Sequence, residues 1–365
     1  MKYKIISYCI ICIFCCACTS PAYRYNELGV SYAQKGQYDL AIEQFILAHN
    51  EDKSLDDITM NLAKAYLMHG QIPESIATAQ QILAKFPDHI EANLIVAQAT
   101  LTMGDKDKSE EILSQLCQKN QKNPICFLAL GQFYFQNKNW DEAITSYQKV
   151  IEFMPNYDFA YVQLGKAYLY KEFQKYDPKS LQSEQTFLEE LERKGQNFDL
   201  SQSLVMFRKA VYLSPKNAEA HTMLGLIAFY SANYKEAELE FKEALQYEPK
   251  QNFLYLALAV TFSQMHEWKN AEEYLDKVQK AMPNEPSSYM LQIFIKIEQG
   301  SYAEALDLCY NTINSFPELE EKLLYSIAQH CINTQWVKQF LTDSNESRRI
   351  IAEKIDNILN PNKLH

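Results

Sequence analysis

Proline and glycine recur along this sequence at a spacing of 34 residues. Four prolines in the second half of the chain follow one another at this step: Pro215, Pro249, Pro283 and Pro317. Three glycines in the first half do the same: Gly36, Gly70 and Gly104. A segment of this size cannot bury its hydrophobic face alone, so copies of it must stack on one another. The period therefore predicts a linear array of one repeated structural element.

The array has one interruption. Pro155 and Pro215 are 60 residues apart, which is one period and 26 more, and Gly165 and Gly225 show the same interval. Two residue types thus indicate a single insertion of 26 residues. We predict it at 171–198, as a helical insertion between the two helices of the fifth repeat. Two interpretations stay open for it, a tolerated surface excursion and a contact for a specific partner.

The repeated element is predicted to be a pair of helices. Hydrophobic residues make up 47% of the 365 residues, and glycine occurs only 9 times, which favours helix over disorder or an all-β fold. Apolar residues follow helical spacing within a repeat, as at Ala237, Phe241 and Ala244. The formal net charge of −11 opposes binding to phosphate backbones, so nucleic acid is not expected as a partner.

The residues within the period resemble the tetratricopeptide-repeat (TPR) family, whose pattern is Trp-x2-Leu-Gly-x2-Tyr, then Ala-x3-Phe, then Pro. The fourth repeat carries that pattern at Leu130, Gly131, Tyr134, Ala143, Tyr147 and Pro155. The resemblance implies an all-α fold, a right-handed TPR superhelical solenoid of helix-turn-helix repeats. Glycine or alanine is expected where the two helices approach closely, with a large aromatic ring filling the gap between them.

The repeats extend over 22–340 as about eight to nine TPR units. The segment 341–365 is predicted to hold a C-terminal capping helix and a tail. Isoleucines at helical spacing place that helix at 345–359, with charged residues on its other faces. A solenoid needs such a terminal element with a polar outer face to stay soluble.

The N-terminus has the pattern of a secretory signal peptide. Lys2 and Lys4 precede an uncharged apolar run, Ile5 to Ala17, that is too short to span a bilayer as a helix. Cys15-Cys16-Ala17-Cys18 resembles the lipobox of bacterial lipoproteins, which implies cleavage after residue 17 and lipidation of Cys18. Residues 18–21 would then be a short linker to the anchor. Thr19 after the cysteine points, by the same resemblance, to the outer membrane facing the periplasm. The alternative is a plain signal peptide whose cysteines are incidental.

No catalytic or metal-binding motif occurs in the sequence. Phosphate-binding glycine loops, HExxH and GxSxG are all absent, and the seven histidines are dispersed. We therefore predict a protein that is not an enzyme and has neither cofactor nor metal. Two cysteine pairs, Cys117 with Cys126 and Cys309 with Cys331, lie across repeat junctions. Disulfides and buried free thiols are both compatible with their positions.

The first helices of TPR repeats line a concave groove that binds proteins or peptides, and the resemblance carries this role to aligned positions here. The apolar candidates are Leu94, Leu128, Phe135, Phe159, Tyr170, Phe229, Tyr230, Phe253, Leu256 and Phe294. The polar candidates are Lys64, Gln98, Gln132, Gln136, Lys166 and Gln264. Buried apolar anchors suit a bound helix or extended peptide. Any of these residues can instead pack between neighbouring repeats.

Three functions are compatible with this sequence. The first is a membrane-anchored scaffold for partner proteins of an envelope machine, resembling in architecture the TPR lipoproteins of type IV pilus and secretin assembly. The second is an adaptor for peptidoglycan enzymes or outer-membrane assembly. The third is a groove that binds a glycan or small ligand. Fold alone does not choose among them.

Overall fold

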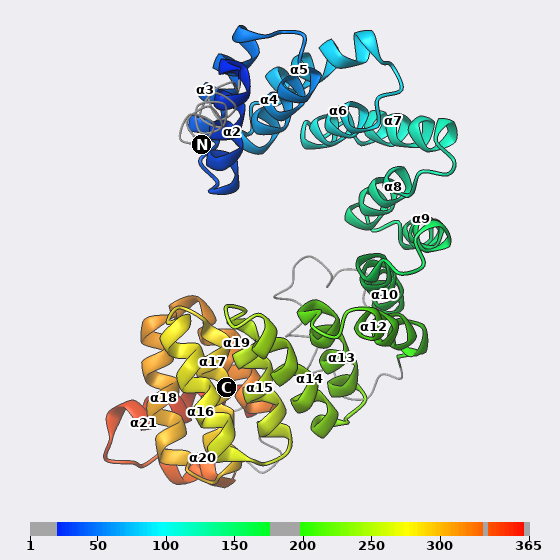
Figure 1. Cartoon of the computed structure of the whole chain (residues 1–365). Helices are drawn as coiled ribbons and strands as arrows, with labels where there is room; N and C mark the ends of the chain where they lie inside the picture. The colour runs from blue at the N-terminus through cyan, green and yellow to red at the C-terminus, as the bar shows by residue number, and fades with distance from the viewer. Residues whose placement is uncertain (1–19, 176–197, 331–334, 361–365) are drawn as a thin grey trace, which may run out of the picture. The chain divides into compact units, whose positions relative to one another are not determined.

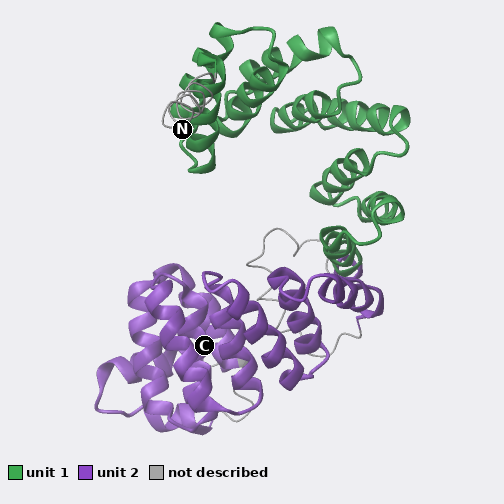
Figure 2. Ribbon diagram, in the orientation of Figure 1, with its two compact units in different colours: residues 1–171 green, residues 172–365 purple. Residues whose placement is uncertain are grey.

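The computed structural model describes residues 20–175, 198–330 and 335–360, and every regular element within these ranges is a helix (Figure 1). The prediction of an all-α TPR solenoid is confirmed. The predicted signal peptide, Cys18 and most of the predicted insertion lie outside the described ranges. The chain divides into two compact units, residues 1–171 and 172–365, which are coloured separately in Figure 2.

Unit 1 contains four complete repeats and the first helix of a fifth, with each repeat formed by two consecutive helices. The helices are α2 (Pro21–Gln34), α3 (Tyr38–Glu51), α4 (Asp56–His69), α5 (Ile72–Lys85), α6 (Ile90–Thr102), α7 (Lys106–Lys119), α8 (Pro124–Gln136), α9 (Trp140–Phe153) and α10 (Asp158–Gln174). The last residues of α10 belong to unit 2.

Unit 2 continues the array and then closes it. Its helices are α12 (Ser201–Leu213), α13 (Ala218–Tyr230), α14 (Tyr234–Tyr247), α15 (Phe253–Gln264), α16 (Trp268–Ala281), α17 (Pro286–Glu298), α18 (Tyr302–Ser315), the short η1 (Pro317–Leu319), α19 (Glu320–His330), α20 (Gln335–Phe340) and α21 (Glu346–Leu359). The predicted insertion, 171–198, begins within the last turn of α10 and ends before α12, and these are the two helices of the fifth repeat.

Three repeats hold their two helices together by placing an aromatic ring on a glycine. A Cβ atom added to Gly225 would lie 2.5 Å from the ring of Phe241. Gly29 meets Phe45 and Gly131 meets Tyr147 in the same way, at 2.6 and 2.7 Å. Any larger residue at these glycines would displace the ring, so the expected close approach of the helices is confirmed.

The second and third repeats join their helices differently. Alanine replaces glycine at Ala63 and Ala97, and a buried serine on the second helix donates a hydrogen bond to that alanine's carbonyl. The Ser75 Oγ donates to Ala63 O at 2.8 Å, and the Ser109 Oγ donates to Ala97 O at 2.9 Å. A direct polar link between the helices thus takes the place of the ring packed on glycine.

The turn between the two helices of a repeat requires a left-handed residue. Gly36, Gly70, Gly104 and Gly300 occupy it with φ between 72 and 88°. Three other repeats place Lys138, Ala232 and His266 there, at φ of 63, 56 and 57°. A residue with a Cβ atom is strained in this conformation, so these three turns are locally less favourable than the glycine turns.

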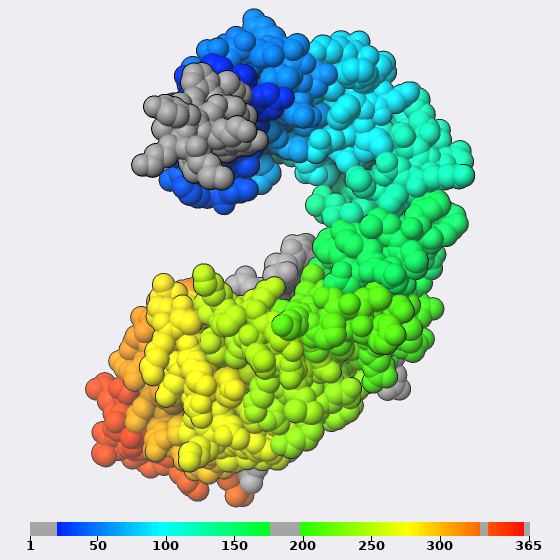
Figure 3. Space-filling model, viewed as in Figure 1, coloured from blue at the N-terminus to red at the C-terminus, as the bar shows by residue number. Residues whose placement is uncertain are grey.

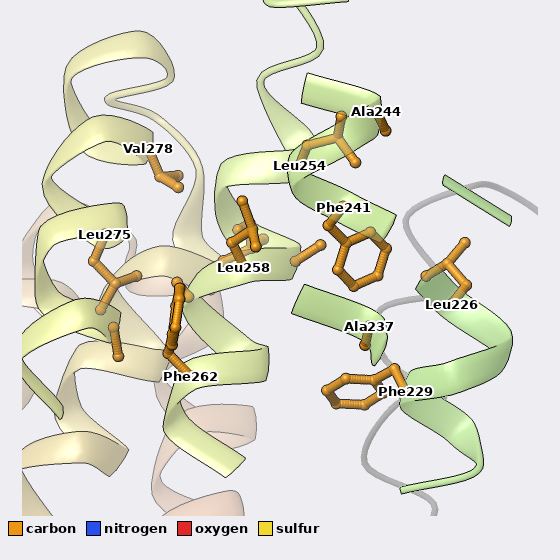
Figure 4. Packing of buried hydrophobic residues seen from close by; sticks show 14 of the residues in the cluster. Leu226, Phe229, Ala237, Phe241, Ala244, Leu254, Leu258, Phe262, Leu275 and Val278 are labelled. Atoms are coloured by element: carbon orange, nitrogen blue, oxygen red, sulfur yellow. The ribbon is translucent and has the colours of Figure 1, made fainter. Parts of the chain in front are cut away.

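The largest core of unit 2 lies between α13, α14, α15 and α16 (Figure 4). Phe241 of α14 is almost fully buried and fits among the neighbouring first helices. Leu258 and Phe262 of α15 lie between that ring and Leu275 of α16. Because α15 is buried on most of its surface, its sequence is apolar nearly throughout rather than amphipathic.

The C-terminal end of the array is covered by α21, which lies over the range where isoleucine spacing predicts a closing helix. The Asn345 side chain caps the helix by accepting from the Arg348 backbone N–H at 3.3 Å. Ile351 and Ile355 are buried against the core of the last repeats. Arg348 binds Asp307 of α18 through two hydrogen bonds, Nε to Oδ1 at 2.8 Å and Nη2 to Oδ2 at 2.6 Å.

Candidate functional site

A pocket of about 280 Å³ lies on the first helices of the second, third and fourth repeats. Its apolar floor comes from half-buried leucines, Leu67 of α4 with Leu94 and Leu101 of α6, together with Leu113 of α7. These helices present one face in common because the 34-residue period returns the same helical position in each repeat. The pocket lies entirely within unit 1.

Polar side chains along the pocket form a ladder. Gln98 and Gln132 occupy the same repeat position on α6 and α8, and Gln136 follows one turn later. All three carboxamides are exposed, and none makes a side-chain hydrogen bond within the described ranges. Lys64 holds the equivalent position on α4, where its Nζ pairs with Glu91 Oε1 at 2.5 Å. Each amide can both donate and accept, which matches the backbone groups of an extended peptide.

The other predicted groove residues of unit 1 are half-buried. Phe135 and Tyr170 come together at the fourth and fifth repeats, with ring centroids 5.5 Å apart and nearly perpendicular planes. Trp140 completes this cluster, stacked on Tyr170 at 5.6 Å and edge-on to Phe135 at 5.2 Å. The Lys166 Nζ lies 5.8 Å from the Phe135 ring centre. Leu128 and Phe159 are half-buried on α8 and α10, outside this cluster.

The predicted groove residues of unit 2 differ in accessibility. Phe229 and Leu256 are buried in the core between repeats, so they stabilise the stacking and offer little surface to a ligand. Tyr230 packs against Phe173 and Phe198, with ring centroids 5.4 and 5.8 Å apart. Phe294 packs against the C-terminal core, and Gln264 is half-buried. Phe253 alone among these apolar candidates is exposed.

Two residues beside the predicted groove of unit 1 were missed by the sequence analysis. Trp140 begins α9, a second helix, and repeat alignment of first helices passes over it. Its indole nitrogen is buried and has no hydrogen-bond partner in the described part of the chain. Glu91 was missed because a single acidic residue in a first turn is normally read as a helix-dipole contact. Glu91 lies seven residues, or about two helical turns, before Gln98, which is the repeat equivalent of Lys64. This spacing is the signal that could have revealed the pair.

The titratable groups point to structural roles. His221 is buried on α13, where its Nε2 donates to Pro215 O at 2.9 Å and its Nδ1 lies 2.7 Å from Glu240 Oε2. Tyr161 and Tyr289, at the same repeat position, also donate to the carbonyl of the preceding proline, each at 3.0 Å. His221 therefore acts as a link between consecutive repeats.

Cys117, Cys126 and Cys309 are buried free thiols, while Cys331 lies outside the described residues. Contact with the Cys126 thiol, together with burial, raises the pKa of Cys117. Burial raises the pKa of Cys309 to about 12. The Cys117 contact in turn lowers the pKa of Cys126. Thiols held in the neutral form are poor nucleophiles, so Cys117 and Cys309 pack as small hydrophobic side chains.

Within residues 20–175, 198–330 and 335–360, no three acidic, histidine or cysteine side chains gather in a way that would hold a metal ion. A search of the same ranges found no helix long and apolar enough to cross a membrane. The predictions on metal, cofactor and catalysis stay predictions.

Family models match much of the array. Two models described as tetratricopeptide repeat match residues 32–99 and 218–251, and one described as TPR repeat matches 131–171. A model of the anaphase-promoting complex (cyclosome) subunit 3 matches 68–150. Together with the helix pairs and the conserved spacing of their contacts, these matches define the class. The chain is a tetratricopeptide-repeat protein.

Curated relatives are similar over part of their length. Human protein O-mannosyl-transferase TMTC1 is 24% identical over 64% of this chain and 23% of its own length. The Bos taurus BBSome complex member BBS4 is 24% identical over 76% of this chain and 48% of its own length. The chain therefore spans less than half of either relative.

Among solved structures, Pseudomonas aeruginosa PilF is 14% identical with a TM-score of 0.51, covering 66% of this chain and 97% of PilF. This likeness shows the fold alone. The fold class supports a protein-interaction scaffold.

Proposed function

We propose that this protein is a lipid-anchored scaffold that binds an extended segment of a partner protein along α4, α6 and α8. The amide ladder of Gln98, Gln132 and Gln136 beside an apolar floor is the observation that carries the proposal. Leucine side chains of the floor would bury alternate side chains of the peptide, while the amides pair with its backbone. Such a combination would give affinity for a peptide without requiring a free carboxyl or amino terminus on that peptide.

The charge of the site also bears on the ligand. The Lys64 ammonium at one end of the ladder is neutralised by Glu91, so the pocket offers no free cation for a C-terminal carboxylate. An internal, extended segment of a partner fits this surface better than a free carboxyl end. We therefore expect the partner to be bound through a loop or linker.

The anchoring part of the proposal rests on sequence. Cys18 in its lipobox-like context would carry the lipid, and Thr19 would direct the chain to the outer membrane facing the periplasm. The partner would then belong to an envelope machine, with type IV pilus or secretin assembly as the first candidate because that is where TPR lipoproteins of similar architecture act. Metabolic labelling with a clickable palmitate, comparing the native chain with Cys18→Ala, tests the anchor directly.

The binding site is tested by crosslinking in cells with a photoreactive phenylalanine analogue at Leu94. The matched control carries the analogue at Tyr212, an exposed position on the second helix α12. One dominant adduct from position 94, lost when Gln98 and Gln132 are both changed to Ala, would support the proposal. An adduct of equal yield from position 212, or one unaffected by the double substitution, would overturn it.

The identity of the crosslinked protein distinguishes the pathways. A secretin or pilus subunit would support the first candidate, and a peptidoglycan hydrolase would replace it with an adaptor role. Failure of the palmitate labelling would remove the anchor while leaving the pocket proposal standing, because the two experiments have separate readouts.

A further inference from the structure

Two cysteines lie opposite each other where the third repeat meets the fourth. Cys117 is two residues before the end of α7, and Cys126 is two residues after the start of α8. Only residues 120–123 separate these helices, which pack against each other. Because the chain reverses direction there, residues equally far from the connection come side by side. The third and fourth repeats are the cyan and turquoise part of unit 1 in Figure 3.

Both thiols are buried in the core between these two repeats. Cys117 is 5% exposed and Cys126 is 0% exposed. They belong to one cluster with Leu113 and Leu116 of α7 and Leu130 of α8. The two thiol groups contact each other, and this contact raises the pKa of Cys117 while it lowers the pKa of Cys126. In the structure both are free thiols.

The repeat itself does not require sulfur at these two positions. Four other junctions place an apolar pair there: Leu83 with Ala92, Ile151 with Ala160, Val211 with Ala220, and Leu245 with Leu254. The second member of each pair is 0% exposed, so the position is a buried one throughout. At the remaining three junctions at least one of the two positions is polar. Two facing cysteines are therefore particular to the junction of the third and fourth repeats.

We propose that Cys117 and Cys126 form a disulfide bond when the chain folds in an oxidising compartment. The bond joins the third repeat to the fourth covalently, across a junction that otherwise depends on noncovalent packing. Sulfur atoms already in contact need little movement of the backbone to bond. Disulfides persist in secreted and envelope proteins and are rare in the cytosol, so the proposal rests on the envelope location proposed above.

The bond forms by exchange with a donor disulfide, supplied by a thiol oxidase of the envelope or, in solution, by oxidised glutathione. One cysteine loses its proton, attacks the donor disulfide and releases one donor thiol. The other cysteine then loses its proton, displaces the second donor thiol and completes the bond. The chain thus gives two electrons and two protons to the donor. Because both thiols are buried once the repeats stack, the exchange takes place before α8 has packed fully on α7.

The bond also restrains one wall of the peptide pocket. Leu113 of α7 and Phe133 of α8 line that pocket and belong to the same core as the two cysteines. Leu113 lies about one helical turn before Cys117, so a link at the junction acts directly beneath the pocket. Oxidation limits how far α7 and α8 can separate, and reduction removes that limit.

The first experiment refolds the full-length chain from urea in a buffer of reduced and oxidised glutathione. Acid stops the exchange, a maleimide blocks the remaining thiols, and trypsin separates peptide 109–119 from peptide 123–138. Mass spectrometry should find these two peptides joined in most molecules, as a species that disappears on reduction. A native chain in which the maleimide blocks both cysteines would overturn the proposal.

The variant that removes the bond is Cys126→Ala, which the fold should tolerate because other junctions carry alanine at this position. Those alanines are Ala92, Ala160 and Ala220. The matched control is Cys309→Ala, which removes a buried cysteine from another part of the array. The joined peptides should be lost in the first variant and retained in the second. Loss in both variants, or a native chain that joins Cys117 mainly to a different cysteine, would overturn the proposal.

The second experiment measures thermal unfolding by circular dichroism, with and without a reductant that breaks the bond. The oxidised native chain should unfold at a temperature at least about 3 °C higher than the reduced chain, because the bond restricts the unfolded state. Cys126→Ala should show no such difference. An equal shift in both chains, or none in either, would overturn the stabilising role of this bond.

The third experiment determines the state of the two thiols in cells that express the chain with its own N-terminus. Cells are quenched with acid before the same blocking and digestion, and the joined peptides should be recovered. Reduced thiols would overturn the proposal, and the palmitate labelling described above then gives the reason. Reduced thiols with a labelled Cys18 would remove the disulfide and leave the anchored scaffold standing. Reduced thiols with an unlabelled Cys18 would remove both the disulfide and the anchor.

Discussion

The two ends of the TPR array are finished in different ways. At the C-terminal end, α21 buries Ile351 and Ile355 and is held to α18 by the two-bond pair between Arg348 and Asp307. At the N-terminal end, α2 and α3 expose Leu28, Leu40 and Leu47. A repeat offers the same stacking surface wherever it stands, and a solenoid stays soluble when its terminal element turns a polar face to the solvent. The C-terminal end carries such an element in α21, whereas the described part of the first repeat leaves three leucines exposed.

The largest effect expected from this difference concerns one leucine position of the repeat, which Leu28 and Leu258 both occupy. Leu258→Ala should lower the free energy of unfolding by about 2–5 kcal/mol, because it leaves a cavity in a fully buried site. Leu28→Ala should cost less than about 0.5 kcal/mol in dilute protein, because that side chain is already half exposed. Urea unfolding of both variants measures the contrast. Equal losses would mean that the first repeat is covered even in the dilute monomer.

A smaller effect is expected from the charge pair that holds the C-terminal cover. Asp307→Asn removes the carboxylate that accepts both hydrogen bonds from Arg348. We expect a small loss of stability, less than for a buried pair because both side chains are partly solvated. Amide hydrogen exchange should increase mainly in α21. Faster exchange throughout unit 2 would instead indicate that the cover stabilises the whole unit.

The left-handed turns of the two units provide a third test. Ala232→Gly should raise stability by about 0.4–1 kcal/mol, because alanine is strained at a φ of 56°. Gly70→Ala, at the same turn in unit 1 with a φ of 85°, should have the opposite sign. Thermal unfolding of the pair gives both values. A destabilised Ala232→Gly variant would contradict the strain inferred from the backbone.

The smallest effect concerns pH at the first repeat. Burial, with Lys53 and Lys85 nearby, lowers the pKa of His49 below 6.5, and His49 Nδ1 lies 3.1 Å from Thr59 Oγ1. The unfolded chain then binds the proton more readily than the folded chain. The contribution of His49 is present above pH 6.5 and is lost as pH falls from there through the folded pKa. Stability measured between pH 7.5 and 5 should decline less in His49→Asn than in the native chain.

Periodicity alone predicted most of the fold. Spacing of proline and glycine located the repeats and the interruption between α10 and α12, and the ring-on-glycine contact of Gly131 with Tyr147 followed from the TPR pattern. The solvent exposure of the predicted groove residues could not be predicted from the repeat spacing or the TPR pattern. Phe135 and Phe229 occupy the same repeat position, yet the first is half-buried and the second lies in a core. Phe229 is packed among residues of α14 and α15, and the spacing of the repeats alone does not predict such packing.

The candidate site was predicted in part. Five polar or apolar residues chosen by repeat alignment do line one pocket: Lys64, Leu94, Gln98, Gln132 and Gln136. Their binding role stays a prediction. Trp140 and Glu91 were missed because each lies at a position that repeat alignment assigns to packing or to a helix end.

The hydroxyl-to-carbonyl links of Ser75 and Ser109 have a consequence for how their repeats can be broken. They lie in adjacent repeats, 34 residues apart, and each accompanies an alanine in place of the close-approach glycine. The fourth repeat, next along the chain, returns to glycine and an aromatic ring. Loss of one hydroxyl group removes the link between the helices in the second or third repeat, whereas the gain of one methyl group at Gly131 disrupts the contact in the fourth.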